Sequence, residues 1–143
     1  MRKTLSLLVI VMSMGLNIFA QDSSSNVNAA APKPVLNPTI GIVLYSNDAE
    51  TIWNAFRLAN FSETRGDTVT IFLIGKGVEA LTVESKEFDI KQKAEEFVTK
   101  GGTIMACATC LKMRNMEADK IITVSGLSDL FEIVKSSKTV LTF

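Results

Sequence analysis

Blocks of apolar residues alternate along the chain with amphipathic stretches, and the spacing of apolar positions differs between the two kinds of block. Five short apolar runs lie at residues 40–45, 68–74, 103–106, 121–124 and 139–143. Continuous apolar runs of this length are typical of strands that are buried on both faces of a sheet. We therefore expect five short strands.

The stretches between these runs carry apolar residues at helical spacing. In the first helix Asn47 can be the N-cap with Glu50 three residues on, and in the second Asp89 can be the N-cap with Gln92. Two glycines at residues 101–102 then end the second helix. The apolar stripes comprise Ile52, Ala55, Phe56 and Ala59 in the first helix, Ile90, Ala94, Phe97 and Val98 in the second, and Leu127, Leu130, Phe131 and Val134 on one side of the last.

The regular alternation of strand and helix predicts an α/β fold, a three-layer α/β/α sandwich around a five-stranded, mostly parallel sheet. Binding and catalytic sites in such sheets form at the carboxyl ends of the strands. In this chain those ends are residues 46–48, 75–78, Cys107 and residues 125–126. Functional side chains are therefore expected along this edge of the sheet.

The first 38 residues do not follow this alternation. Residues 1–20 have a basic start, a short apolar run and a small residue at Ala20, which is the layout of a secretory signal peptide. The run is shorter than the roughly 20 residues that span a bilayer, so we expect cleavage and no stable membrane anchor afterwards. Residues 21–38 are polar, small and proline-containing, which predicts a flexible linker. The folded domain is then residues 39–143, and the protein is expected to be periplasmic or secreted.

Composition excludes several kinds of chemistry. The 143 residues include no histidine and only two cysteines, so Ser-His-Asp and Cys-His catalysis and a four-thiolate zinc site within one chain are excluded. The 15 basic and 15 acidic residues balance, and loss of the leader would leave a net charge of −2. We therefore expect no nucleic-acid partner, and the sequence indicates no cofactor.

The two cysteines, Cys107 and Cys110, form the strongest candidate for chemistry, with C-x-x-C spacing. They lie at a strand end where a helix is predicted to begin, and a helix N-terminus favours thiolate over thiol. Lys112 and Arg114 add positive charge nearby. Cys107 is the expected nucleophile, and Cys110, one helical turn on, can resolve an adduct as a disulfide. The alternative is a structural oligomer in which the pair is an inert disulfide.

Methionines around the cysteines give a further interpretation. Met105 and the two cysteines form an M-x-C-x-x-C pattern like that of soft-metal chaperones, and Met113 and Met116 add thioethers. Thiolate and thioether ligands suit Cu(I). Methionines beside a strand also serve as core residues. A Cu(I)-binding module therefore remains an alternative to sulfur or thiol chemistry.

Three segments together resemble the DsrE/DsrF-like family of sulfur-handling proteins, which includes the sulfur-relay subunits of tRNA thiolation. The first is the apolar strand and acidic-capped helix at residues 40–60. The second is residues 102–107, which end in Cys107 and precede the basic stretch at residues 111–114. The third begins with Ser-Gly-Leu at residues 125–127 and closes with the last apolar run. The resemblance covers nearly all of the predicted domain.

The resemblance implies a five-stranded α/β/α sandwich that assembles into a homo-oligomer, a trimer or hexamer. In sulfur-relay members the cysteine that matches Cys107 carries persulfide sulfur, which implies sulfur donor and acceptor proteins, or small thiols, as partners. Cys110 has no counterpart in those subunits, so its role rests on its spacing alone. The relay subunits are cytoplasmic and this chain has an export signal, so tRNA thiolation is not implied. We expect an exported protein that handles sulfane sulfur or thiols through a Cys107 persulfide or mixed disulfide.

Overall fold

The structure, a computed structural model, describes residues 39–143. The expected signal peptide and linker lie outside the described residues. In chain order the elements are β1 (Ile40–Leu44), α1 (Ala49–Thr64), β2 (Val69–Leu73), the 3₁₀ helix η1 (Gly75–Thr82), α2 (Ile90–Thr99), β3 (Thr103–Cys107), α3 (Ala108–Met113), β4 (Thr123–Ser125), α4 (Leu127–Ser136) and β5 (Thr139–Thr142). None of the helices in this range is long and apolar enough to cross a membrane.

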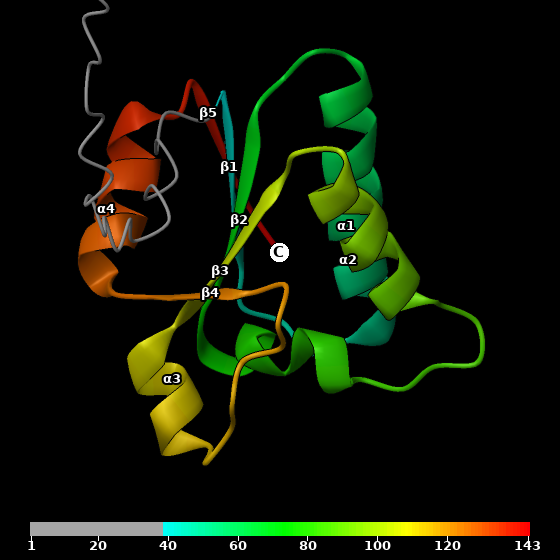
Figure 1. Cartoon of the computed structure of the whole chain (residues 1–143), viewed down its shortest axis with the longest axis vertical. Coiled ribbons are helices and arrows are strands. Elements are labelled where there is room, and N and C mark those ends of the chain that lie inside the picture. The colour runs from blue at the N-terminus through cyan, green and yellow to red at the C-terminus, as the bar shows by residue number, and fades with distance from the viewer. Residues whose placement is uncertain (1–38) are drawn as a thin grey trace, which may run out of the picture. The chain divides into compact units, whose positions relative to one another are not determined.

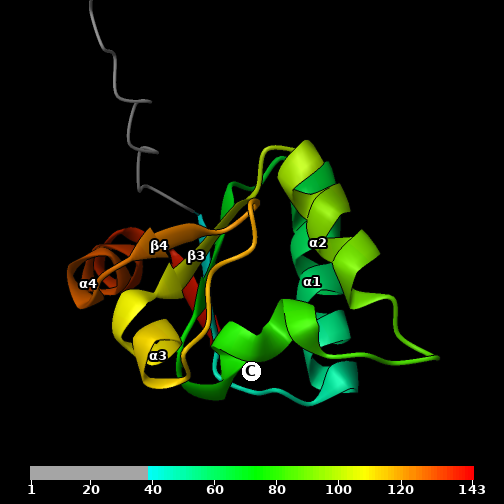
Figure 2. The same cartoon turned by 60° about the horizontal axis from the view of Figure 1, so that its bottom comes forward.

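The five strands form one sheet in the order β4-β3-β2-β1-β5, and every pairing is parallel. Helices α1 and α2 cover one face of the sheet and α4 covers the other (Figure 1 and Figure 2). The predicted α/β sandwich is confirmed, with a sheet that is parallel throughout.

Alternation along the strands divides the core into two unequal parts, because successive side chains point to opposite faces. The larger part lies against α1 and α2 and takes from the strands Ile42, Leu44, Val69, Ile71, Leu73, Ile104 and Ala106. The smaller part consists of Phe72 and Met105, of Cys107, and of Ile133 on α4. Cys107 therefore belongs to the α4 face of the sheet.

The N-cap of helix α1 lies one residue later than predicted. Asp48 is the N-cap, and its Oδ1 accepts a hydrogen bond from the Thr51 amide at 2.8 Å. The prediction of Asn47 was wrong, because the Asn47 side chain instead donates to the Glu79 carboxylate on η1 at 2.9 Å. The Asp89 cap of α2 is confirmed by the 2.9 Å hydrogen bond from the Gln92 amide to its carboxylate.

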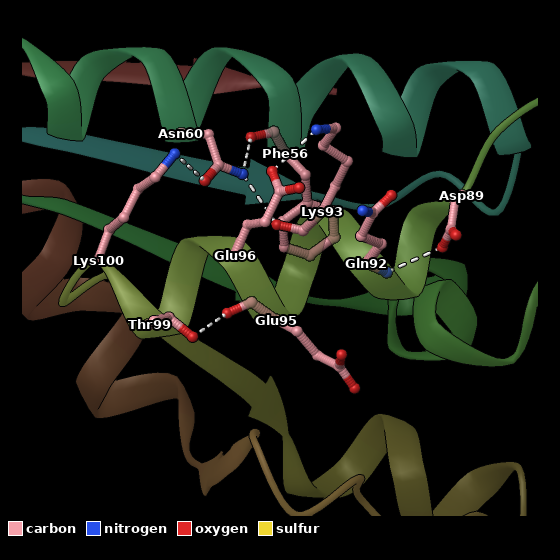
Figure 3. Close-up of polar contacts among 9 residues, drawn as sticks. All are labelled: Phe56, Asn60, Asp89, Gln92, Lys93, Glu95, Glu96, Thr99 and Lys100. Atoms are coloured by element: carbon pink, nitrogen blue, oxygen red, sulfur yellow. Dashed lines mark hydrogen bonds and ion pairs between the residues drawn. The ribbon is translucent and has the colours of Figure 1, made fainter.

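A buried asparagine joins α1 to α2 (Figure 3). The Asn60 Nδ2 donates to the carbonyl of Phe56 at 3.0 Å and to that of Lys93 on α2 at 2.8 Å. The ammonium of Lys100 donates to the Asn60 Oδ1 at 3.1 Å. All polar atoms of this side chain are thus engaged between the two helices, which fixes how they pack on the sheet.

Two segments differ from the sequence expectation. The glycines of residues 75–77, expected only to end a strand, begin the 3₁₀ helix η1. A Cβ on Gly77 would lie 2.0 Å from the Leu44 carbonyl oxygen, so η1 packs directly on the end of β1. The fourth strand starts at Thr123 and not at residue 121, because the Ile122 amide donates to the Asp119 carbonyl in a turn at 2.9 Å.

The apolar stripe predicted for α4 is mostly exposed. Ile133 is fully buried against the sheet, whereas Leu127, Phe131 and Val134 are 68%, 59% and 46% exposed. We call the three exposed residues of this helix, Leu127, Phe131 and Val134, the α4 patch.

Candidate functional site

The two cysteines lie at the carboxyl edge of the sheet, as predicted. Cys107 is the last residue of β3, and Cys110 lies in the short helix α3 that follows at once. Both are unpaired thiols, and both belong to the apolar cluster under α4. Cys107 is buried at 8% exposure and Cys110 is half-buried. The two sulfurs therefore lie in mostly apolar surroundings and not on an open surface.

The sulfur of Cys110 contacts the neighbouring strand end. The Gly75 amide, directly after β2, donates a hydrogen bond to the Cys110 Sγ at 3.3 Å. This contact follows from the sheet, because β2 pairs with β3 in a register that places Leu73 beside Ala106. Gly75 has a φ of 61°, in the left-handed region that favours glycine. From the sequence we expected the backbone amides at the start of the following helix to donate to Cys107. Cys107 is the N-cap of α3, but its side chain accepts no capping hydrogen bond from that helix.

Opposing influences act on the pKa of Cys110. Burial raises this pKa most, and a hydrogen bond with the Cys107 side chain raises it further, as expected when the neutral thiol is the donor. The Gly75 amide and the positive charge of Arg114 lower it, and the net direction is upward. Cys110 is thus held as a neutral thiol that can donate to the sulfur of Cys107.

A chain of polar side chains runs beside the thiols. The Arg114 Nε donates to the Glu79 Oε1 at 2.9 Å, and the other oxygen of Glu79 accepts from Asn47 at 2.9 Å. The Arg114 Nη1 also donates to the Cys110 carbonyl at 3.4 Å. These hydrogen bonds hold the pKa of Glu79 below its usual value, the Asn47 bond having the largest effect and the Arg114 bond the next. The loops after β1, β2 and β3 are thereby joined at one edge.

The methionines suggested for a metal site separate in the structure. Met105 packs in the same cluster as Cys107 and Cys110. Met113 is 76% exposed, and Met116 packs against the larger core instead. Within residues 39–143 no group of three or more His, Cys, Asp or Glu side chains is placed to hold a metal ion. Of the soft side chains in residues 39–143, Met105, Cys107 and Cys110 share the smaller cluster.

Sequence reasoning identified the cysteines but missed the groups around them. Residues 46–48 and 75–78 were expected at the edge of the site, which covers Asn47 and Gly75. Glu79 was not identified, since it lies one residue beyond the second of these ranges. A signal existed in the strand order, because parallel neighbours bring their following loops to the same edge.

The sequence profile of the DsrE/DsrF-like family matches residues 39–143. The chain belongs to this family. Among solved structures, YchN from E. coli superposes with a TM-score of 0.63 at 22% identity, over 73% of this chain and 98% of that one. A conserved protein of unknown function from Bacteroides thetaiotaomicron, BT1422, superposes with a TM-score of 0.60 at 23% identity, over 73% of this chain and 95% of that one. No curated protein matches the chain. This DsrE-like chain therefore shares its fold with those structures.

Proposed function

We propose that this DsrE-like protein handles sulfane sulfur or thiols through Cys107 and Cys110. The observation that carries the proposal is the contact between the two thiols, with one sulfur under a backbone amide at the carboxyl edge of the sheet. The pKa of Cys110 is raised, so this thiol stays neutral, and Cys107 at the end of β3 is proposed as the attacking sulfur. Membership of the DsrE/DsrF-like family supports this chemistry.

The first step is transfer of a sulfur atom to Cys107. The Cys107 thiolate attacks the outer sulfur of a persulfide donor, a bond forms between that sulfur and Cys107 Sγ, and the donor S–S bond breaks. The donor leaves as a thiolate, and Cys107 carries a persulfide. An acceptor thiolate that attacks the outer sulfur then regenerates the Cys107 thiolate, so a complete transfer involves no net oxidation.

Cys110 gives the persulfide a second outcome. After losing its proton, Cys110 attacks Cys107 Sγ, a disulfide forms between the two cysteines, and the outer sulfur leaves as hydrosulfide. The two thiols are oxidised and the sulfane sulfur is reduced, so a small thiol or a dithiol protein must reduce the disulfide before the next cycle. Attack of Cys107 on a disulfide follows the same course, with a thiolate as the leaving group.

Intact-mass spectrometry after treatment of the reduced full chain with polysulfide tests this proposal. We expect wild type and Cys110→Ala to gain the mass of sulfur atoms and Cys107→Ala to gain none. Cys110→Ala is the matched control, because it removes a thiol from the same cluster and keeps the proposed carrier. Equal adducts on Cys107→Ala would reject Cys107 as the carrier.

Met105 packs in the same apolar cluster as the two thiols, which favours a second candidate, a Cu(I)-binding module with Met105, Cys107 and Cys110 as ligands. Anaerobic titration of the reduced protein with Cu(I) in competition with a chelator tests it. A stoichiometric site that weakens in Met105→Leu would support the metal function. Binding that is unchanged by Met105→Leu would remove the methionine from the proposal.

We also propose export, from the basic, apolar and small-residue pattern of residues 1–20. Expression of the full chain in E. coli, followed by fractionation and N-terminal sequencing, tests it. The expected product lies in the periplasm and begins at Gln21. A cytoplasmic protein that retains its first residues would contradict export.

We further propose a homo-oligomer, a trimer or hexamer, in which the α4 patch packs against a second copy. The patch places three large apolar side chains on one helix face. Exposed Glu132 and Lys135 carry opposite charges on the same helix, so the surface can pair with itself. The α4 patch lies on the same helix that covers the thiols, so assembly through it would also restrict access to the thiols.

A further inference from the structure

Two contacts tie the element that carries Cys110 to the element that carries its amide donor. At the first, the Gly75 amide of η1 donates to the sulfur of Cys110 on α3. At the second, Glu79 of η1 forms an ion pair at 2.9 Å with Arg114, which directly follows α3. Gly75 and Glu79 are four residues apart on η1, which is about one helical turn. Cys110 and Arg114 are also four residues apart, on α3 and directly after it. The ion pair and the sulfur contact therefore lie at opposite ends of one short interface.

Arg114 also holds the backbone of Cys110 directly. Its Nη1 donates to the Cys110 carbonyl at 3.4 Å while its Nε is engaged by Glu79. Both charged side chains of the pair are only about 30% exposed, at 27% for Arg114 and 30% for Glu79. The planar guanidinium can bond two acceptors in fixed directions, which a lysine ammonium cannot reproduce.

From this geometry we infer that Arg114, held by Glu79, is a positioning residue for Cys110, and that it sets how fast Cys110 closes onto Cys107. The inference rests on the proposed function of the thiol pair. When Cys110 loses its proton, the negative charge forms on its sulfur, to which the Gly75 amide donates. The ion pair between Arg114 and Glu79 keeps that amide in place. Asn47 steadies Glu79 from the loop after β1.

The charged groups nearest Cys110 come from two regions of the chain. Arg114 follows α3 and lowers the pKa of Cys110, while Lys76 and Glu79 lie on η1. Lys112, also on α3, is exposed. Arg114 and Lys112 thus have the same charge on one helix region, but only Arg114 contacts Cys110.

Closure can be measured with an aromatic disulfide that releases a coloured thiolate. Cys107 attacks the reagent, forms a mixed disulfide and releases one coloured thiolate. Cys110 then attacks Cys107 Sγ, forms the internal disulfide and releases the second coloured thiolate. The rate of the second release, followed from acid to alkaline pH in the reduced full chain, reports Cys110 alone. Cys110→Ala, which gives only the first release, identifies the two phases.

We expect Arg114→Gln to slow the second release at least about tenfold at its pH plateau, since a ~1 Å displacement of reacting groups can cost about a hundredfold. Its pH profile should move to higher pH, because a positive charge near the thiolate is lost. Glu79→Gln should also slow the plateau but move the profile to lower pH. Arg114→Lys keeps the charge and should keep the wild-type profile with a reduced plateau.

The matched control is Lys112→Gln, which removes an equal charge two residues from Cys110 and should leave plateau and profile within about twofold. A purely structural role for Arg114 would lower the melting temperature without moving the pH profile. Wild-type plateau and profile in both Arg114→Gln and Glu79→Gln would overturn the inference. Failure of the polysulfide adduct would reject the proposed function alone, because this assay uses no sulfane sulfur.

Discussion

The amide of Gly75 donates a hydrogen bond to the sulfur of Cys110 over 3.3 Å, although 35 residues separate them in the chain. Parallel pairing of β2 with β3 brings the two loops together at the carboxyl edge. The contact gives the half-buried sulfur of Cys110 an amide donor that was not expected from the sequence, in which the amides at the start of a helix were expected to favour the Cys107 thiolate. It makes the loop after β2 part of the thiol site.

Gly75→Ala should lower both stability and thiol chemistry. Its φ of 61° costs a residue with a Cβ about 1–2 kcal/mol, although the nearest atom to an added Cβ, the Tyr45 carbonyl oxygen, lies 3.9 Å away. Relief of that strain turns the amide away from Cys110, so we expect slower release of the second coloured thiolate. Urea unfolding and the closure assay measure the two effects.

Gly66→Ala is the matched control for this substitution. Gly66 also has a positive φ, of 88°, and an added Cβ would have no atom within 4 Å. We expect a similar loss of stability with unchanged closure. Equal slowing of closure in both variants would show that strain alone, and not the Gly75 amide, controls the reaction.

The raised pKa of Cys110 predicts a pH dependence of stability. A thiol whose pKa is higher in the folded state stabilises the fold below the unfolded-state pKa of about 8.5 and loses that contribution as pH rises further. We expect the unfolding free energy of the reduced protein to fall between about pH 8 and 9.5. Cys110→Ala should flatten this decline. Urea titrations in a reductant at several pH values measure it, and an identical slope in the variant would contradict the burial of this thiol.

Asn60→Ala should destabilise the domain by about 1–3 kcal/mol, because the Lys93 carbonyl loses its side-chain donor and buried polar groups are left unpaired. Asn54→Ala on the same helix is the matched control. Asn54 is half-buried and faces an open surface hollow, and alanine is the better helix former, so we expect little change or a slight gain. Chemical unfolding compares them. A loss for Asn60→Ala no larger than for Asn54→Ala would show that the contact between α1 and α2 contributes little.

Phe131→Glu tests the α4 patch. A charge in the centre of an apolar interface should dissociate the proposed oligomer, since it would be buried without a partner. Ser128→Glu, on the same helix and also exposed, adds the same charge outside the α4 patch and should leave the assembly intact. Sedimentation velocity over a range of concentrations measures the mass. A wild-type monomer, or an oligomer retained in Phe131→Glu, would contradict the proposed interface.

Much of the fold could be predicted because burial requires continuous apolar runs in the strands. The run that contains Ile42 and Leu44 and the stripe of Phe56 and Ala59 both marked buried positions, and the structure places them in the core. The prediction that the apolar stripe of α4 is buried was wrong for most of its residues, because periodicity identifies an apolar face without showing what covers it. Phe131 has the same spacing as a core residue but lies exposed.

The site was only partly predictable for a similar reason. Cys107 and Cys110 stand out because their spacing is local. The contacts of Cys110 with Gly75, and of Arg114 with Glu79, each cross 35 residues and depend on strand order and on the unexpected 3₁₀ helix. No local pattern in the chain records such contacts.

The most direct test of the central claim is a time course of intact mass after one equivalent of polysulfide is added to the reduced protein. We predict that wild type first gains the mass of one sulfur atom and then converts to a form lacking two hydrogen atoms, the internal disulfide. Cys110→Ala should keep the sulfur adduct, and Cys107→Ala should never form it. A wild-type protein that gains no sulfur at any time would contradict the account.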